Sequence, residues 1–280
     1  MPEGDTVWLA GRRMNNALAG GALVRGELRV PAHATSDLAG RTVLEVRSRG
    51  KHLLTRLSGR ITLHTHFRMD GSWHLYPAGE SWRGGPEWQV RAVLQTPTWQ
   101  AVGYRLPVVS LLPTDHESHV VGHLGPDLLG EDWNPLEAAR RLSSDPSREI
   151  GEVLLDQRVM AGLGNIYRTE VCFLVGVTPW TPIRDVDDVD RVVLLARRLL
   201  VANRERPRQV TTGLAGRGAR HWVFERGQCL RCGSRVARSR QGAATRERIT
   251  YWCPECQTGP APWPTAPGGG TSNGAARGPR

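Results

Sequence analysis

The chain has 280 residues, a length that suits two medium-sized domains and a tail. Its formal net charge of +10 and isoelectric point near 10.3 favour a polyanion such as a nucleic acid as partner, although an arginine-rich enzyme of another kind has a similar balance. No run of about 18 apolar residues exists to cross a membrane, and the acidic start, Met1-Pro2-Glu3-Gly4-Asp5, does not match a secretory signal, so we expect a cytoplasmic protein without a membrane partner.

The N-terminal part of the chain is predicted to be a helix followed by a β-sandwich. Apolar residues from Val7 to Met14 repeat at helical spacing over residues 5–18, and a glycine pair ends this helix. From residue 22 to residue 112 the apolar residues fall in short, often alternating runs separated by turn residues, which is typical of a two-layer sandwich. We assign residues 1–125 to this domain.

The second half is predicted to be helical. Asn134 offers an N-cap, Pro135 a first helical residue and Glu137 an acid in the first turn, so a helix begins there and runs to about residue 142. Apolar periodicity predicts three more helices, at residues 150–161, 165–175 and 185–203. These form a helical domain at 126–218. From residue 258 to residue 280 the chain is rich in Gly, Pro and Ala, and we expect a disordered tail.

Two CxxC pairs, Cys229/Cys232 and Cys253/Cys256, are separated by residues 233–252. Four thiolates at this spacing are typical of a structural zinc site, in which a β-hairpin brings the two pairs around one tetrahedral ion. Two disulfides are the alternative, which a reducing compartment disfavours. Because four cysteines leave no open position for a catalytic water, we predict that the zinc finger, residues 219–257, has a structural role.

Basic residues gather in the predicted hairpin, and one of the other basic residues is unusual. The hairpin arginines are suited to contact phosphates, with a solvated charged turn as the alternative; they are Arg231, Arg235, Arg238, Arg240, Arg246 and Arg248. Lys51 is the only lysine among 37 basic residues. A coding bias towards arginine can leave one lysine by chance, but an ammonium is also a compact donor that a guanidinium does not replace.

Three separated segments resemble the endonuclease VIII/formamidopyrimidine-DNA glycosylase family over roughly residues 2–257. They are Pro2-Glu3-Gly4-Asp5, the stretch from Leu155 to Tyr167 with Gly162-Leu163-Gly164-Asn165, and the stretch from Arg248 to Gln257 with its second cysteine pair. The resemblance implies an α+β multidomain fold: an N-terminal β-sandwich with a flanking helix, a helix-two-turns-helix domain and a C-terminal four-cysteine zinc-finger β-hairpin. It also implies double-stranded DNA with oxidised bases or abasic sites as the partner of a monomeric enzyme.

The resemblance implies covalent catalysis by Pro2. Removal of Met1 exposes a secondary amine, which condenses with the deoxyribose C1′ and gives an iminium that permits β- and then δ-elimination. The alternative is that Pro2 only sets the helix start. Glu3 resembles the family's general acid, and the alternative is an acid in the first helical turn, a position that Asp5 fills equally well.

Four further residues match family positions that contact the DNA backbone. Lys51 and Arg248 match the hairpin lysine and the finger-tip arginine, which hold the phosphate beside the lesion, and Arg246 is a second candidate for the arginine. Asn165 lies at the turn between two helices, where it binds phosphate or serves as a plain helix cap. His123 occupies a position where the family often has a phosphate-binding arginine, and a surface histidine without a role is the alternative.

An enzyme that extrudes a base must fill the hole that the base leaves. The stretch from Phe67 to Trp73 resembles the family's void-filling loop, with Met69 as the apolar wedge and Arg68 as a probe of the opposite base. Ordinary core filling is the alternative for Met69. Asp70 stands where endonuclease VIII enzymes can have an aromatic residue, and this departure leaves the lesion range open.

The function predicted from the resemblance is a bifunctional DNA glycosylase/AP lyase of base excision repair. Residues at the start of the chain and Tyr251-Trp252 before the second cysteine pair look more like endonuclease VIII, which favours oxidised pyrimidines. The formamidopyrimidine branch, which acts on oxidised purines, is the alternative. A non-catalytic zinc-ribbon DNA-binding protein also explains the charge and the cysteines, but it has no need of Pro2, Glu3 and Lys51.

Overall fold

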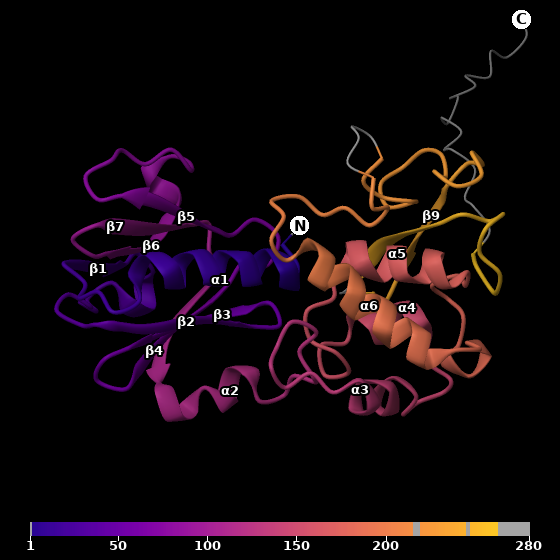
Figure 1. Ribbon diagram of the computed structural model, residues 1–280, viewed down its shortest axis with the longest axis horizontal. Coiled ribbons are helices and arrows are strands. Elements are labelled where there is room, and N and C mark those ends of the chain that lie inside the picture. Colours follow the sequence, from indigo (N-terminus) through magenta and orange to yellow (C-terminus); the bar gives the residue numbers. More distant parts are fainter. Residues whose placement is uncertain (1, 215–218, 245–246, 263–280) are drawn as a thin grey trace, which may run out of the picture.

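The computed structural model describes residues 2–214, 219–244 and 247–262, which form a β-sandwich lobe and a helical lobe with a hairpin (Figure 1). Each sheet of the sandwich has four strands, and all neighbouring strands are antiparallel. One sheet has the order β1 (Arg25–Leu28), β6 (Val90–Gln95), β7 (Trp99–Tyr104), β5 (Ser72–Pro77). The other has the order β2 (Val43–Arg49), β3 (His52–Leu57), β4 (Ile61–His66), β8 (Val108–Pro113). The predicted sandwich is confirmed.

Helix α1 (Gly4–Leu18) contacts strands of both sheets and completes the core of the sandwich. Its apolar face buries Val7, Met14 and Leu18 against apolar residues of both sheets, so the periodicity that predicted the helix is also its packing face. The N-terminal end of α1 lies at the junction of the two lobes (Figure 1). The first residues of the chain are therefore next to the helical lobe.

The helical lobe contains α3 (Pro135–Leu142), α4 (Ile150–Leu155), α5 (Asn165–Val175) and α6 (Val189–Asn203), whereas the short helix α2 (Ser118–Val121) lies beside the sandwich (Figure 1). The cap predicted for α3 is present, because the side chain of Asn134 accepts a hydrogen bond of 3.0 Å from the backbone N–H of Glu137. The lobe has its own apolar core, built from α3 to α6. No described helix is long and apolar enough to span a bilayer.

Helix α4 is shorter than predicted, because it ends at Leu155 and not near residue 161. The carboxylate of Asp156 accepts the backbone N–H of Arg158 at 3.1 Å, a local turn that competes with the helix. Further on, Ala161 forms a β-bridge with Asp127. Residues 156–164 are thus the turns that lead into α5, whose predicted bounds are confirmed.

Helix α6 begins four residues later than predicted. Residues 183–185 form a separate 3-10 turn, and Asp188 caps α6 by accepting a hydrogen bond of 2.8 Å from the backbone N–H of Arg191. The apolar positions used for the prediction continue across the turn, so periodicity alone did not separate the two elements.

The C-terminal strands β9 (Ala237–Gln241) and β10 (Arg248–Trp252) form the predicted hairpin. Arg231, which the sequence suggests as a phosphate contact, instead lies over the ring of Phe173 on α5, with 4.4 Å between its guanidinium carbon and the ring centroid. Arg246 lies outside the described residues. Thr258 pairs with the loop after α5, so the start of the segment expected to be disordered has a defined place, and residues 263–280 of that segment lie outside the described residues.

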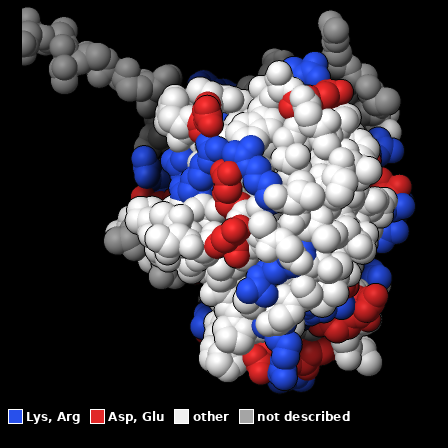
Figure 2. Space-filling view, turned by 90° about the vertical axis from the view of Figure 1, so that its left-hand side faces the viewer, with Lys and Arg blue, Asp and Glu red and all other residues white. Residues whose placement is uncertain are grey.

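Charge on the far end of the sandwich is mixed. Figure 2 shows basic side chains next to acidic ones on this face, which looks away from the helical lobe. Ion pairs of the sandwich include Arg25 with Glu27 and Arg56 with Glu117. Acidic partners therefore offset part of the positive charge in this lobe, and the charge of +10 alone does not locate a binding face.

Candidate active site

The start of the chain packs against the turn that leads into α5. The backbone N–H of Gly4 donates to the carbonyl of Gly162 at 2.8 Å. A Cβ on Gly4 would lie 2.8 Å from the Cα of Gly162, so the two segments meet at a distance that only glycine permits. Pro2 is half-buried beside this contact. The site therefore joins residues of both lobes.

Glu3 is fully buried, and its carboxylate lies at the N-terminus of α5. It accepts hydrogen bonds from the backbone N–H groups of Gly164 at 2.7 Å and Ile166 at 2.8 Å. Glu3 is the N-cap residue of its own helix, α1, but its side chain makes no capping hydrogen bond there. The alternative reading of Glu3 as a residue that stabilises its own helix is therefore not supported, because the unpaired N–H groups that it satisfies belong to the other lobe.

Burial raises the pKa of Glu3 to about 7. The positive charge of Lys51 and the two backbone hydrogen bonds lower it, whereas the neighbouring carboxyl of Asp5 raises it. A carboxyl with a pKa near neutrality exchanges protons readily at physiological pH. The arrangement thus suits Glu3 to general acid and base chemistry beside Pro2.

Lys51 follows the turn between β2 and β3. At this turn Gly50 has a φ of 56° and donates its backbone N–H to the carboxylate of Asp127 at 2.7 Å, so a residue of the connection between the lobes holds the turn in place. Burial lowers the pKa of Lys51, the charge of Glu3 raises it, and the charge of Arg248 lowers it. The charges of Glu3 and Arg248 thus both act on Lys51.

Asn165 is the first residue of α5, but it is not a plain cap of that helix. The N-cap position is taken by Gly164. The Asn165 amide nitrogen donates to the carbonyl of Ile249 at 2.9 Å, next to Arg248 on β10. The side chain therefore joins α5 to the finger hairpin, and Arg248 is held exposed beside it.

The predicted void-filling loop connects β4 to β5. Phe67 is buried, whereas Met69 has 50% of its surface exposed, so core filling does not explain Met69. Arg68 adopts the left-handed conformation with a φ of 47°, and its backbone N–H donates to Nδ1 of His66 at 2.9 Å. The loop therefore has a defined shape with Met69 exposed at its tip.

A cluster of four histidines, His52, His64, His66 and His123, lies next to Lys51, and the sequence analysis found only one of them. His52 Nδ1 and His64 Nε2 are 2.8 Å apart, and the rings of His66 and His123 have centroids 4.8 and 6.2 Å from that of His52. Burial lowers the pKa of His52 to about 3 and that of His66 to about 4, so both are neutral at physiological pH. The sequence signal for this cluster was the alternation of His64 and His66 on β4, whose neighbouring strand β3 carries His52 opposite His66.

Two buried residues of the site were assigned no role from the sequence. Asp5 accepts hydrogen bonds from the Tyr167 hydroxyl at 2.7 Å and from the Gln209 amide at 3.0 Å, and burial raises its pKa. Arg168 is fully buried on α5, one turn after Asn165. Neither burial is visible in the sequence, because charged residues on helices are usually exposed.

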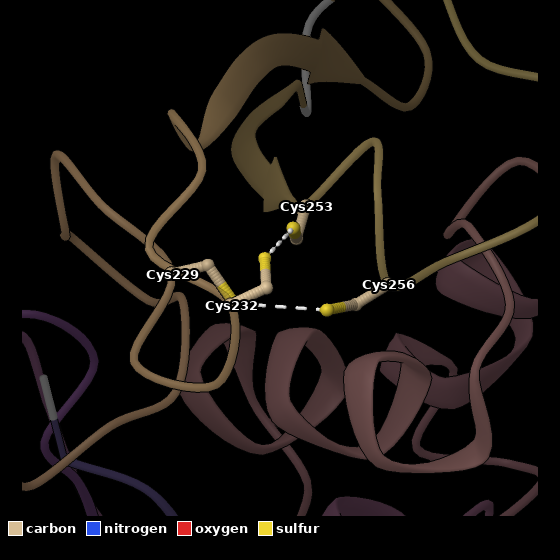
Figure 3. Close-up of side chains that lie close together, drawn as sticks. All are labelled: Cys229, Cys232, Cys253 and Cys256. Carbon is tan, nitrogen blue, oxygen red and sulfur yellow. Dashed lines mark hydrogen bonds between the residues drawn. The ribbon is translucent and has the colours of Figure 1, made fainter.

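The four predicted cysteine ligands converge (Figure 3). Their sulfur atoms all lie within 4.8 Å of one another; the Sγ atoms of Cys232 and Cys253 are 3.5 Å apart and those of Cys229 and Cys256 3.9 Å apart. Four thiolates around one ion with bonds of about 2.3 Å have sulfurs about 3.8 Å apart, whereas a disulfide needs about 2.05 Å. The group is thus positioned to bind a metal.

The close contact between Gly164 and Glu3 yields a test of the site's geometry. A Cβ at Gly164 would lie 2.6 Å from the carboxyl carbon of Glu3. We expect Gly164→Ala to displace this carboxylate and to lower the free energy of unfolding by about 1–3 kcal/mol. Gly227→Ala is the matched control, because a Cβ there meets no atom within 4 Å. Thermal unfolding measures both, and equal melting temperatures would show that the contact is not a constraint.

Comparison with known proteins gives a consistent result over most of the chain. Residues 1–105 match the formamidopyrimidine-DNA glycosylase N-terminal domain, and residues 124–200 match the formamidopyrimidine-DNA glycosylase H2TH domain. The "probable endonuclease 8 2" of Streptomyces coelicolor is 56% identical over 268 residues, which cover 94% of this chain and 96% of that protein. The "DNA-(apurinic or apyrimidinic site) lyase Nei2" of Mycolicibacterium smegmatis is 44% identical, with 92% and 99% covered.

The fold is also that of a solved enzyme bound to DNA. The Lactococcus lactis Fpg in complex with DNA that contains an abasic site superposes with a TM-score of 0.73 and 21% sequence identity, and it covers 92% of this chain and 100% of its own. Two lobes and a hairpin in this arrangement are therefore shared with the solved structure.

Proposed function

This chain belongs to the formamidopyrimidine-DNA glycosylase/endonuclease VIII family, and we infer that it is a DNA glycosylase and AP lyase of base excision repair. The observation that carries this function is the buried carboxyl of Glu3, with a pKa about 7, next to Pro2 and within the field of Lys51. A protein without catalytic activity has no need of a buried carboxyl whose pKa is near neutrality at the junction of its lobes. A zinc-ribbon protein without catalysis therefore accounts for less of the structure.

Pro2 is the nucleophile in the proposed reaction. Once Met1 is removed, its amine forms a bond to the deoxyribose C1′, and the bond from C1′ to the base breaks, so the base leaves with the bonding electrons and takes up a proton. Protonation of the ring oxygen by Glu3 opens the sugar and leaves an iminium between Pro2 and C1′. The iminium makes a C2′ proton acidic, and its loss expels the 3′ phosphate; a second elimination releases the 5′ phosphate.

The remaining site residues bind and deform the DNA. Lys51, Arg248 and Asn165 hold the backbone beside the target nucleotide. All three carry donors, the charges of Glu3 and Arg248 both act on Lys51, and Asn165 bonds to Ile249, the neighbour of Arg248. Met69 and Arg68 enter the stack, and the exposure of Met69 supports this. His123, the exposed member of the histidine cluster, is a further contact of the DNA backbone.

The substrate we propose is duplex DNA with an oxidised pyrimidine. Support comes from the 56% identical relative, which is named an endonuclease 8, whereas the solved Fpg shares the fold at 21% identity. An enzyme for oxidised purines is the second candidate. We further propose that the protein acts in the cytoplasm as a monomer, because a single chain contains both lobes that form the proposed site.

Borohydride trapping tests the enzyme and its nucleophile. Reduction of the iminium should link the protein covalently to duplexes that contain thymine glycol, 8-oxoguanine or an abasic site. The duplex with thymine glycol should react faster than the duplex with 8-oxoguanine. Pro2→Gly should form far less covalent adduct, because the primary amine of a flexible glycine is a poor replacement for the constrained secondary amine of proline. Absence of any adduct, with protein shown by mass to begin at Pro2, contradicts the proposed function.

The raised pKa of Glu3 predicts how activity and stability depend on pH. Because the pKa in the folded protein, about 7, is above the ordinary value of 4.5, the protonated carboxyl stabilises the fold; this contribution is complete below pH 4.5 and is lost as the pH rises through 7. Base excision in single turnovers should likewise fall above pH 7.

Glu3→Gln is the matched variant for this pH dependence, because it keeps the shape without the titration. The Glu3→Gln variant should lose the pH dependence of stability that comes from Glu3. Its rate of base excision should be about 10²–10⁴-fold lower. Parallel stability curves for the variant and the wild type would contradict the assignment.

The metal that we propose for the four cysteines is zinc, in a structural role. All four thiolates would hold the zinc ion. The bound ion would keep the hairpin in shape and thereby position Arg248. Elemental analysis should find one zinc per chain. Removal by a chelator or Cys253→Ser should abolish DNA binding and trapping, while circular dichroism of the sandwich changes little, and a variant without zinc that still traps would contradict the structural role.

A further inference from the structure

Arg168 is the largest side chain that is fully buried among the described residues, and it has no ionic partner there. Its guanidinium donates to three neutral acceptors, Oδ1 of Asn165, Oγ1 of Thr250 and Oε1 of Gln241, the last at 3.1 Å. Its Nε has no hydrogen-bond partner in the described part of the chain. A buried guanidinium without a carboxylate is costly, so its presence calls for a function.

Groups of both charge signs act on the buried guanidinium of Arg168. Burial lowers the pKa of Arg168 to about 10; the Cys172 thiol, Glu3 and Glu152 raise it, and Arg248 lowers it. The guanidinium thus remains a cation at neutral pH. Arg248 acts on it as a second positive charge, and of the two carboxyls that act on it Glu3 has a pKa of about 7 and is only partly ionised at neutral pH. A DNA phosphate would add a negative charge beside these two cations.

Arg168 also fixes the orientation of the Asn165 amide. Because Oδ1 of Asn165 accepts from Arg168 and Nδ2 donates to the carbonyl of Ile249, a flipped amide would set donor against donor and acceptor against acceptor. One amide hydrogen of Asn165 then has no acceptor among the described residues. Thr250 and Gln241 belong to the hairpin, so the same guanidinium ties this amide to the element that carries Arg248.

We propose that Arg168 is a positioning residue of the phosphate site, which holds the donor of the Asn165 amide towards the DNA backbone and locks α5 to the finger hairpin. This inference rests on the proposed function. It adds a residue that touches no DNA but determines how Asn165 meets the phosphate. Its effect is on binding of the DNA backbone and not on the chemical step.

A double-mutant cycle between Arg168 and Asn165 tests this role. Arg168→Met, Asn165→Ala and the double variant are compared by KM and kcat for cleavage of an abasic-site duplex. We expect Arg168→Met to raise KM about tenfold or more, the size of a hydrogen bond to a charged group, with little change in kcat. The KM of the double variant should be no higher than that of Asn165→Ala alone, because both changes remove the same phosphate contact.

Controls separate positioning from folding. Thr250→Val removes one acceptor of Arg168 but leaves the bond to Asn165, so its KM should change far less than that of Arg168→Met. Zinc content and melting temperature report whether each variant folds. If Arg168→Met does not fold, Arg168→Lys, which keeps the charge without the planar fork, replaces it in the cycle.

The outcomes for this inference and for the proposed function are distinct. A wild type that forms no borohydride adduct with the abasic duplex contradicts the proposed function itself. If the wild type forms the adduct, but the effects of Arg168→Met and Asn165→Ala multiply or the loss is confined to kcat, Arg168 does not act through Asn165 and the inference is wrong.

Discussion

The site depends on one interaction, the capping of α5 by the carboxylate of Glu3. The partners are far apart in the sequence, since Glu3 and Ile166 are 163 residues apart, and they belong to different lobes. The backbone N–H groups at the start of a helix attract a carboxylate, yet burial raises the free energy of its charged form. These effects oppose each other and leave the pKa near 7, a value that an exposed glutamate does not have. Packing of the lobes therefore sets the chemistry of the residue.

The cations of the site are each carried by a different element, and each is held by a contact outside the site. Asp127 holds the turn before Lys51, and the cysteine group shapes the hairpin that carries Arg248. Arg168 fastens that hairpin to α5. Like charges brought together repel, so the free energy of folding of both lobes offsets this repulsion, which a phosphate bound at the proposed site would relieve. The hairpin and the lobe junction are consequently both parts of the binding site that we propose.

The sandwich contributes the loop that we propose enters the base stack, and backbone geometry gives this loop its shape. A left-handed conformation at Arg68 costs free energy, and the hydrogen bond to His66 offsets it. His66 accepts this bond only when Nδ1 carries no proton, and burial beside other histidines and the Lys51 ammonium keeps the ring neutral. The loop that exposes Met69 is thus coupled electrostatically, through His66, to Lys51.

The sequence by itself determined those features whose signals are local. Periodicity showed α1, the Asn134 cap showed the start of α3, and the two CxxC pairs showed the metal group, because each depends on residues a few positions apart. The resemblance of three segments supplied the proposed roles of Pro2, Glu3 and Lys51. Only the tertiary structure decided that Glu3 caps α5, that α4 stops at Leu155, that Arg231 stacks on Phe173 and that Arg168 is buried. Burial and pairing across the lobes depend on the three-dimensional path of the chain, and desolvation, which sets the pKa values, has no signal in the order of the residues.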